Sequence, residues 1–294
     1  MYTAKLFKDN KRLEETNCII CHSSNYILLH DFQPFKILRC IDCNTAYLSP
    51  RLEEAEIMKI YQSDEYFKCY SENISDSYDL QKESLRLTFK QFIKILMKKK
   101  LITGGRLLEI GCAYGNFLAE VRPLFNYTAG IDFSDEAVEK AKDYADVIIK
   151  GGIEQLDLFD KDFDTIISTN VIEHVYNPHE FVSKACSKLS YNGTLILITP
   201  KFDGIWYHLL KSKWHSFKIP EHICFYNKSS MKKLFSDNGF NNIQIFSASH
   251  AFPLSVILSK FKINISNNIV NSLNIWLPDV MIIGIGMKSN KTRI

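Results

Sequence analysis

Four of the eight cysteines occur as two C-x-x-C pairs, Cys18 with Cys21 and Cys40 with Cys43. Each pair directs two thiolates towards one point, so the two pairs together provide four ligands for a tetrahedral Zn²⁺ ion, at about 2.3 Å per Zn–S bond. Four thiolates leave no open coordination position, so we expect a structural ion and not a catalytic one. The residues between the pairs are expected to form a small hairpin that the ion stabilises. The alternative is four free cysteines on two strands.

A second set of residues combines a glycine-rich turn with acidic side chains. The segment E-I-G-C-A-Y-G begins at Glu109 and contains Gly111, Ala113 and Gly115. A dinucleotide site requires G-x-G-x-x-G, which is absent here, and a carboxylate would repel phosphates. The acid suits a cofactor that carries cationic groups and no phosphate, as S-adenosylmethionine does. Asp132, about 20 residues further on, stands where an acid binds ribose hydroxyls in related folds.

Two histidines follow expected strands at the edge where an acceptor pocket would open. His174 follows the fourth expected strand, and His222 lies beyond the fifth, after an aromatic-rich segment. If the cofactor is S-adenosylmethionine, the expected reaction is methyl transfer, which depends mainly on holding the acceptor in line and needs a base only when the acceptor must lose a proton. Each histidine is therefore a candidate base, and a buried structural histidine is the alternative. Glu173 and His174 are also compatible with the start of a helix.

The elements that would position these residues alternate between strand and helix. Strands are expected at 106–110, 127–131, 147–149, 163–169 and 194–199. Helices are expected at 79–99, 116–122 and 178–189, and a further helix is expected after Ser134. Ser134 precedes two acidic residues, which is typical of a helix N-cap. The alternation predicts a parallel sheet covered by helices, with the functional segments at the carboxyl ends of its strands.

The C-terminal part carries weaker patterns. Strands are expected at 241–247 and 280–288, and the apolar segment 251–277 is expected to form two amphipathic helices. Those helices would cover substrate, a second subunit or a membrane surface. The aromatic residues of 202–217 predict either a lid over the acceptor or a helix docked on the core. A second aromatic cluster, with the same two alternatives of acceptor pocket or packing, comprises Tyr61, Tyr66, Phe67 and Tyr70.

The motifs around the glycine turn resemble those of the class I S-adenosylmethionine-dependent methyltransferases. The first motif of that family is an acid, an apolar residue and G-x-G-x-G, and here Ala113 replaces the middle glycine. The resemblance implies an α/β fold with a Rossmann-like seven-stranded sheet, helices on both faces and an antiparallel seventh strand. It also implies a cofactor site formed by Glu109, Gly111, Ala113, Gly115, Asp132, Phe133, Gly152, Ile153 and Asn170. In that site, Gly152 and Ile153 would border the adenine and Asn170 the methionine end.

On the acceptor side, the chain is similar to the zinc-ribbon subgroup of this family. Zinc-containing deoxysugar C-methyltransferases carry a run H-E-H-L-S-Y-F whose E-H pair serves as base; Glu221 and His222 match that pair, and Pro220 replaces the first histidine. Ubiquinone-pathway O-methyltransferases carry a metal-binding E-x-x-E-H, but Asn170 stands at its first position, so we expect no catalytic metal. The resemblance thus implies His222, Glu221 and His174 as catalytic candidates and a small-molecule or glycan acceptor, with a sugar or sugar nucleotide favoured.

Composition limits the other possibilities. The chain has 36 Lys and Arg against 33 Asp and Glu, a net charge of +3, so we expect no strong field for nucleic acid or anionic membranes. It opens without a secretory signal and has no apolar run of about 20 residues, so a cytoplasmic location is expected. We expect a zinc module at 1–70 and a catalytic domain at 71–294. The alternatives are a nucleic-acid or protein methyltransferase that grips its substrate with the ribbon, and a non-catalytic cofactor-binding module.

Overall fold

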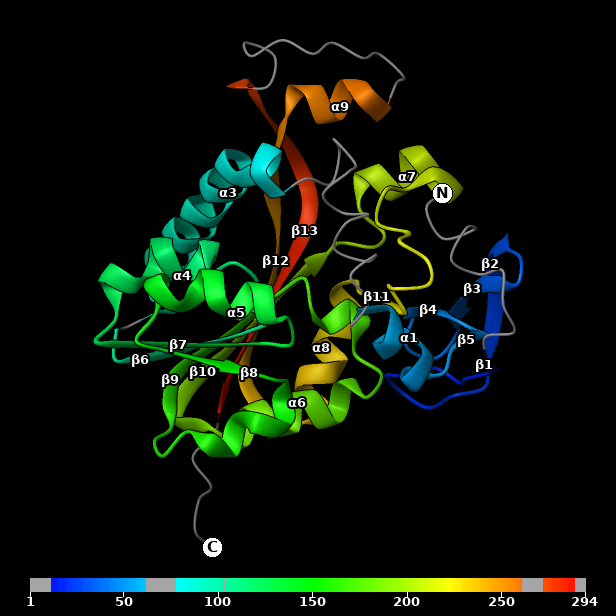
Figure 1. Cartoon of the computed structure of the whole chain (residues 1–294). Coiled ribbons are helices and arrows are strands. Elements are labelled where there is room, and N and C mark those ends of the chain that lie inside the picture. Colours follow the sequence, from blue (N-terminus) through cyan, green and yellow to red (C-terminus); the bar gives the residue numbers. More distant parts are fainter. Residues whose placement is uncertain (1–11, 62–77, 103, 261–271, 289–294) are drawn as a thin grey trace, which may run out of the picture.

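The computed structural model describes residues 12–61, 78–102, 104–260 and 272–288. A large sheet covered by helices lies beside a smaller sheet that is formed mainly by the N-terminal part of the chain (Figure 1). The expected domain boundary at 70–71 lies outside the described residues, so the division at that point stays a prediction. The side chains of the second aromatic cluster, Tyr61, Tyr66, Phe67 and Tyr70, lie outside them as well.

The large sheet has seven strands in the order β12-β13-β10-β9-β6-β7-β8. Their bounds are Arg106–Ile110 (β6), Tyr127–Asp132 (β7), Val147–Lys150 (β8), Phe163–Thr169 (β9), Leu189–Pro200 (β10), Phe240–Pro253 (β12) and Asn274–Lys288 (β13). β13 runs antiparallel to β10 and β12, and the other pairings are parallel. The expected Rossmann-like sheet with an antiparallel seventh strand is therefore confirmed.

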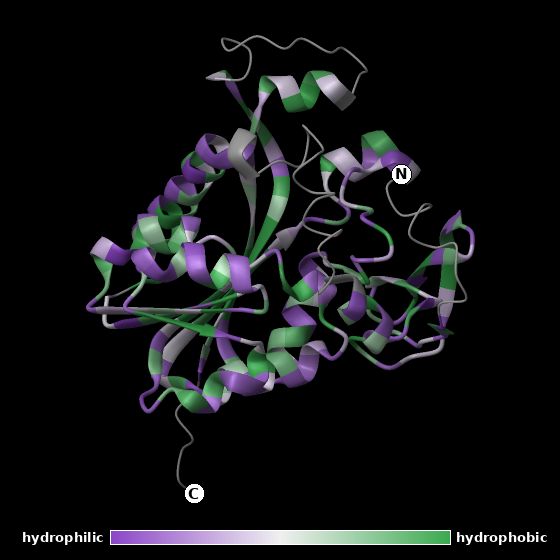
Figure 2. Ribbon diagram, in the orientation of Figure 1, coloured by the Kyte–Doolittle hydropathy of each residue, from purple (hydrophilic) through white to green (hydrophobic). Residues whose placement is uncertain are grey.

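Helices cover both faces of this sheet. The main ones are Tyr78–Lys98 (α3), Asn116–Val121 (α4) and Asp135–Ala141 (α5) on one face, and Pro178–Ser187 (α6) and Lys228–Asp237 (α8) on the other. Successive residues of a central strand enter different cores: Leu195 and Leu197 pack towards α6 and α8, Ile196 and Ile198 towards α3 and α4. Because both faces are covered, apolar residues predominate in the central strands (Figure 2).

Capping residues fix where several helices begin. The Ser134 hydroxyl accepts a hydrogen bond from the Ala137 amide at 3.2 Å, which confirms the expected N-cap of α5. Asn177 and Asn227 cap α6 and α8 in the same way. Shorter elements complete the chain: Glu54–Tyr61 (α1), Ile205–Leu210 (α7), Leu254–Lys260 (α9), and 3₁₀ turns at Arg122–Leu124, Lys142–Tyr144, Ile153–Leu158, Ile172–His174 and Lys211–Lys213.

The smaller sheet has the order β11-β4-β3-β2. Its strands are Tyr26–Phe32 (β2), Phe35–Cys40 (β3), Ala46–Leu48 (β4) and Cys224–Phe225 (β11), and a separate two-stranded sheet pairs Leu13–Glu14 (β1) with Arg51–Leu52 (β5). The hairpin expected between the cysteine pairs is confirmed by β2 and β3. The fourth strand, β11, comes from the C-terminal half of the chain. A two-residue strand has no periodicity of its own, so the sequence did not indicate it.

The prediction of two amphipathic helices within 251–277 is wrong at both ends of that segment, which are strands. β12 and β13 extend as an antiparallel pair, with His250 opposite Leu277 and Pro253 opposite Asn274. Of the residues in this segment that the structure describes, α9 and the single residue Ser272 are helical. Pairing gives each strand a hydrogen-bond partner for its backbone, and this outweighs a local helical pattern.

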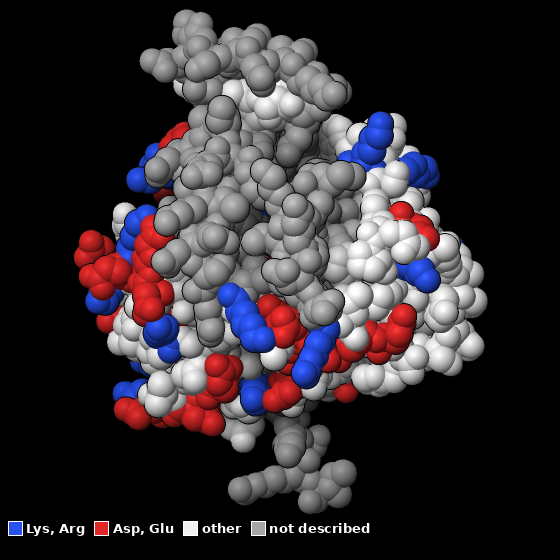
Figure 3. Space-filling view, turned by 45° about the vertical axis from the view of Figure 1, so that its right-hand side comes forward, with Lys and Arg blue, Asp and Glu red and all other residues white. Residues whose placement is uncertain are grey.

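The surface agrees with the balanced composition. Among the described residues on the face shown in Figure 3, acidic and basic side chains intermingle. None of the described helices combines the length and the hydropathy that crossing a bilayer would require.

Candidate active site

The glycine turn after β6 has the backbone that its residues predict. Gly111, Ala113 and Gly115 have φ angles of 76°, 45° and 73°, in the left-handed region that favours glycine. A Cβ atom on Gly111 would lie 2.2 Å from Cγ2 of Val171, so the turn closes against the residue after Asn170. Ala113 adopts a left-handed conformation despite its Cβ atom, which explains how it stands in for the middle glycine.

Two carboxylates lie beside this turn. Oδ2 of Asp132, at the end of β7, accepts a hydrogen bond from the Ala113 amide at 2.8 Å, and its Oδ1 accepts one from the Ser134 amide at 3.0 Å. Glu109 is only 3% exposed, and its Oε2 has no hydrogen-bond partner among the described residues. Burial, followed by the charge of Asp132, raises the pKa of Glu109 well above its ordinary value. The pair thus provides a buried acidic position that a cationic ligand would satisfy.

A side chain next to Asp132 borders the expected adenine position. The Phe133 ring is 54% exposed and lies over Gly152, where a Cβ atom would come within 2.3 Å of Cζ of Phe133. Ile153 begins the 3₁₀ turn that follows Gly152. The missing side chain of Gly152 thus lets the Phe133 ring pack on its backbone, while about half of the ring stays exposed.

Asn170 follows β9 with a φ angle of 56°, and its amide donates to the Ile198 carbonyl at 2.8 Å. It is exposed at the carboxyl edge of the sheet. The next residue, Val171, contacts the Gly111 turn as described above. The structure therefore places the expected cofactor residues of β6, β7 and β9 along one edge, as the sequence predicted for a doubly wound sheet.

A second cluster of polar side chains lies beyond Asn170. The ligand atoms of Glu173, His174 and His222 lie within 4.8 Å of one another. The rings of His174 and His222 meet edge to face, with centroids 4.6 Å apart. The structure thus brings together the two histidines that the sequence singled out, and it adds Glu173. Three such groups are close enough to share one proton or one cation.

Glu221 enters the cluster through its backbone. Its carbonyl oxygen and Nδ1 of His174 are 3.1 Å apart, so Nδ1–H donates to it and fixes the His174 ring. The carboxylate in the cluster belongs to Glu173, whereas the sequence comparison of the E-H pair singled out Glu221. The signal that was available for Glu173 was its place next to His174 at the end of a strand.

Burial controls the charges of this cluster. The Thr199 hydroxyl donates to Oε2 of Glu173 at 2.8 Å, and Oε1 has no partner among the described residues. Burial raises the pKa of Glu173 to about 7. Burial lowers the pKa of His174 to about 4, and burial, followed by repulsion from His174, lowers the pKa of His222 well below its ordinary value. Both imidazoles are therefore neutral at pH 7, and each is a weaker base than a histidine in water.

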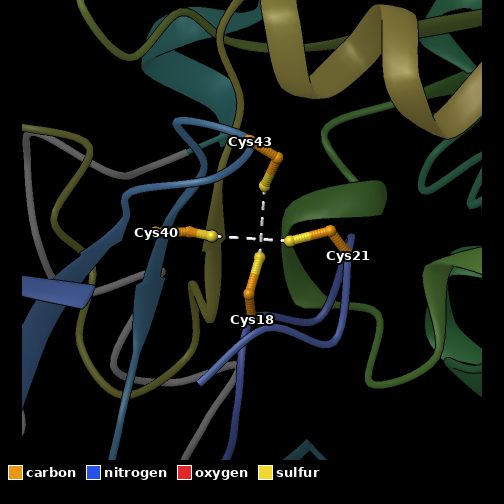
Figure 4. A group of neighbouring side chains, drawn as sticks. All are labelled: Cys18, Cys21, Cys40 and Cys43. Carbon is orange, nitrogen blue, oxygen red and sulfur yellow. Dashed lines mark hydrogen bonds between the residues drawn. The ribbon is translucent and has the colours of Figure 1, made fainter. Parts of the chain in front are cut away.

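The four paired cysteines converge on one point (Figure 4). The Sγ atoms of Cys18 and Cys43 are 3.4 Å apart, as are those of Cys21 and Cys40. A tetrahedron with Zn–S bonds of about 2.3 Å has edges of about 3.8 Å, so the four sulfurs need only small outward shifts to hold the ion. The residues present therefore fit a structural zinc ion.

The aromatic segment 202–217 packs against the small sheet. Phe202, Tyr207 and Trp214 are buried in one cluster with residues of β3, β4 and β5. Nε1 of Trp206 donates to the Pro278 carbonyl at 2.6 Å, which ties α7 to β13. Of the two expected roles for these rings, docking on a core is the one that their contacts support.

Known proteins with similar sequences and structures agree with this geometry. Residues 82–245, more than half of the chain, match the family described as methyltransferase domain. The mitochondrial ubiquinone biosynthesis O-methyltransferase of Schizosaccharomyces pombe is 28% identical over 124 residues, which is 40% of this chain and 44% of that protein. The ubiquinone biosynthesis O-methyltransferase of Maricaulis maris is 29% identical over 102 residues, which is 32% of this chain and 39% of that protein. The chain thus matches less than half the length of either relative.

Among solved structures, a SAM-dependent methyltransferase from Archaeoglobus fulgidus superposes with a TM-score of 0.54 at 17% identity. The match covers 76% of this chain and all of that one. A likeness at this level of identity concerns the fold, and it agrees with the strand order given above.

Proposed function

Because the chain belongs to the family of methyltransferase domains, we propose that it transfers the methyl group of S-adenosylmethionine to a small-molecule acceptor. The observation that carries the proposal is the buried acidic position beside the glycine turn. Glu109 has an oxygen without a partner, and Asp132 holds the turn through Ala113. A phosphate-containing cofactor would be repelled there, whereas a cationic nucleoside would gain a charge-assisted hydrogen bond.

When bound, S-adenosylmethionine supplies an activated methyl group on a sulfonium that leaves as a neutral sulfide. The residues of this chain bind and orient. Asp132 would accept hydrogen bonds from the ribose hydroxyls, Phe133, Gly152 and Ile153 would border the base, and Asn170 would lie against the methionine end. Much of the rate would come from the alignment that these contacts impose on the two reactants.

On the acceptor side, we assign the proton-accepting role to the cluster around His222. A neutral imidazole beside the buried Glu173 carboxylate can take a proton from an acceptor hydroxyl, and the carboxylate stabilises the resulting cation. His174, oriented by the Glu221 carbonyl, adds a second neutral imidazole at 4.6 Å. The catalytic group therefore comprises His222 and His174, with Glu221 acting through its carbonyl.

The acceptor class follows from two lines of support. The four-cysteine module together with Glu221 and His222 resembles the sugar methyltransferases, which favours a sugar or sugar nucleotide. The two relatives described above, from Schizosaccharomyces pombe and Maricaulis maris, are ubiquinone biosynthesis O-methyltransferases. Both groups of acceptors are small molecules that carry hydroxyls.

We propose that the module holds a structural zinc ion, which the convergence of four sulfurs supports.

The test combines binding with turnover. Calorimetry should show that the purified protein binds S-adenosylmethionine and its demethylated product, and Asp132→Ala should lose this binding while its thermal unfolding stays cooperative. Methyl-labelled cofactor should then be incubated with a panel of sugar nucleotides and a panel of phenolic precursors. A labelled sugar product would support a sugar or sugar nucleotide as the acceptor. A labelled phenolic product would show that the acceptor is a phenol and not a sugar. A native protein that binds neither cofactor form overturns the proposal.

A further inference from the structure

We call the two C-x-x-C pairs and strands β2, β3 and β4 the four-cysteine module. Residues 223–227 are attached to this module along their whole length. The Leu48 amide donates to the Ile223 carbonyl at 3.0 Å, and β11 then pairs antiparallel with β4. At the far end, the side-chain amide of Asn227 donates to the Asn44 carbonyl at 2.7 Å. The segment directly after His222 is therefore a strand of the module's sheet, although it lies far from the module in the sequence.

The same segment is attached to the catalytic cluster. The Ile223 amide donates to the Glu173 carbonyl at 2.9 Å, and the His222 amide donates to the Lys218 carbonyl at 2.8 Å. Ile223 thus bonds to the module through its carbonyl and to the cluster through its amide. A displacement of β4 would be transmitted to His222 over one residue.

The cysteine knuckles determine where β4 begins. The Asn44 amide donates to the Cys40 carbonyl at 3.1 Å, and the Cys40 amide donates to the Thr45 carbonyl at 2.9 Å. Asn44 has a φ angle of 64°, so this tight turn is held by its contacts. Asn44, which accepts the bond from Asn227, lies directly after Cys43. Loss of the four-sulfur site would therefore free the turn that anchors residues 223–227.

The rest of the module is clamped to the catalytic core. Asn238 donates through Nδ2 to Nδ1 of His179 at 3.1 Å, which leaves Nε2–H of His179 to donate to the Ile20 carbonyl at 2.9 Å. Ile20 lies inside the first C-x-x-C pair. Cys18, Cys40 and Cys43 are buried in the same core as α6 and α8. The two C-x-x-C pairs therefore pack against the catalytic core. This position suits a structural role better than the binding of a macromolecular substrate at an exposed surface.

We infer that the four-cysteine module is a positioning element for the acceptor side of the site, and that Asn227 is its key positioning residue. The inference rests on the proposed function and assigns the module a part in it. The module holds the segment that carries His222, whereas Glu109 and Asp132 are held by β6 and β7 of the large sheet. Turnover should therefore depend on the module, and cofactor affinity should not.

The test is Asn227→Ser, with Asn177→Ser as its matched control. Both asparagines cap a helix, because Asn227 accepts from the Ser230 amide at 2.9 Å and Asn177 from the Glu180 amide at 3.2 Å. Serine preserves an N-cap acceptor at either position, so only Asn227→Ser removes a bond to the module. We expect Asn227→Ser to lower kcat about fivefold, as for one lost buried hydrogen bond, with cofactor Kd changed less than about twofold. The amides of residues 223–225 should exchange faster with solvent.

Removal of zinc with a chelator, followed by readdition, gives a second measurement. Depleted protein should show the same faster exchange at 223–225 and the same loss of kcat, with unchanged exchange in β6 and β7, and both changes should reverse with zinc. Native exchange and native kcat in both Asn227→Ser and the depleted protein would overturn the inference. So would an equal loss of kcat in Asn177→Ser. If the native protein makes no product with any acceptor, the proposed function fails, and the exchange data still decide whether the module holds this segment.

Discussion

The backbone amide of Ala113 donates a hydrogen bond to Oδ2 of Asp132 at 2.8 Å, so the glycine turn after β6 and the acid at the end of β7 form one unit. Each carboxylate oxygen has a second lone pair. Asp132 can therefore keep its bonds to the turn while it accepts hydroxyls of a ligand. The Asp132 side chain thus contributes both to the conformation of the turn and to the proposed recognition of the cofactor.

Glu109→Gln should raise the stability of the cofactor-free protein and lower its affinity for the cofactor. Neutralising a buried carboxylate that has an oxygen without a partner removes a desolvation cost, so the free energy of unfolding of the cofactor-free protein should rise by about 1 kcal/mol at pH 7. Affinity for S-adenosylmethionine should fall about tenfold or more, because a charge-assisted bond is lost. Urea unfolding and calorimetry measure the two effects. Glu139→Gln, at an exposed acid of α5, is the control, and unchanged affinity in Glu109→Gln would contradict the assignment.

Gly152→Ala should weaken cofactor binding without affecting the fold. The φ angle of Gly152 is −122°, which alanine adopts readily, but the new Cβ atom would meet the Phe133 ring. That ring is half exposed and can swing into solvent, so stability should change by less than about 0.5 kcal/mol. Affinity should fall about fivefold through lost contact with the base. Phe133→Ala should cause a similar loss, and the double variant should add little to it, as a double-mutant cycle would show. Additive losses would contradict a shared contact.

How far the sequence predicted the site depended on how local each signal was. Glu109, Asp132 and the two C-x-x-C pairs stand at short, fixed spacings from strands or turns, and their places were predicted. Glu173 could not be distinguished from a helix start, because its role depends on Thr199 and His222 from other elements. β11 was missed for the same reason, since its two residues become a strand only by pairing with β4. Strands at 241–247 and 280–288 were predicted, but the extensions of β12 and β13 into 251–277 were missed for the same reason, because their mutual pairing replaced the expected helices.

Glu173→Gln and Glu221→Gln form a matched pair that identifies the functional carboxylate. Glu173 supplies a side chain to the cluster, and Glu221 supplies a backbone carbonyl, which glutamine leaves in place. We expect Glu173→Gln to lower kcat by about 100-fold, the order expected for impaired proton transfer, and Glu221→Gln to stay within about threefold of the native protein. Steady-state kinetics with the labelled cofactor measure both, and calorimetry should show native cofactor affinity in each. A larger loss of kcat in Glu221→Gln than in Glu173→Gln would identify the Glu221 side chain as the functional carboxylate.

His250 should make the protein less stable in acid. It lies in β12, stacks on Phe252 with ring centroids 4.4 Å apart, and donates from Nδ1 to the Ala251 carbonyl at 2.7 Å. Burial lowers the pKa of His250 to about 4, whereas an unfolded histidine titrates near 6.5. Between these values the unfolded chain binds the proton and the folded chain does not, so this contribution to stability is full above pH 6.5 and is lost as the pH falls towards 4.

The corresponding experiment compares native protein with His250→Gln by urea unfolding at pH 7 and pH 5. The native protein should lose about 2 kcal/mol more than the variant over this interval. His174 and His222 are present in both proteins, so their own contributions cancel in the comparison. His208→Gln, at an exposed histidine of α7, should follow the native protein. If native protein and His250→Gln lose stability in parallel, His250 accepts a proton in the folded state, and the burial argument for its low pKa is wrong.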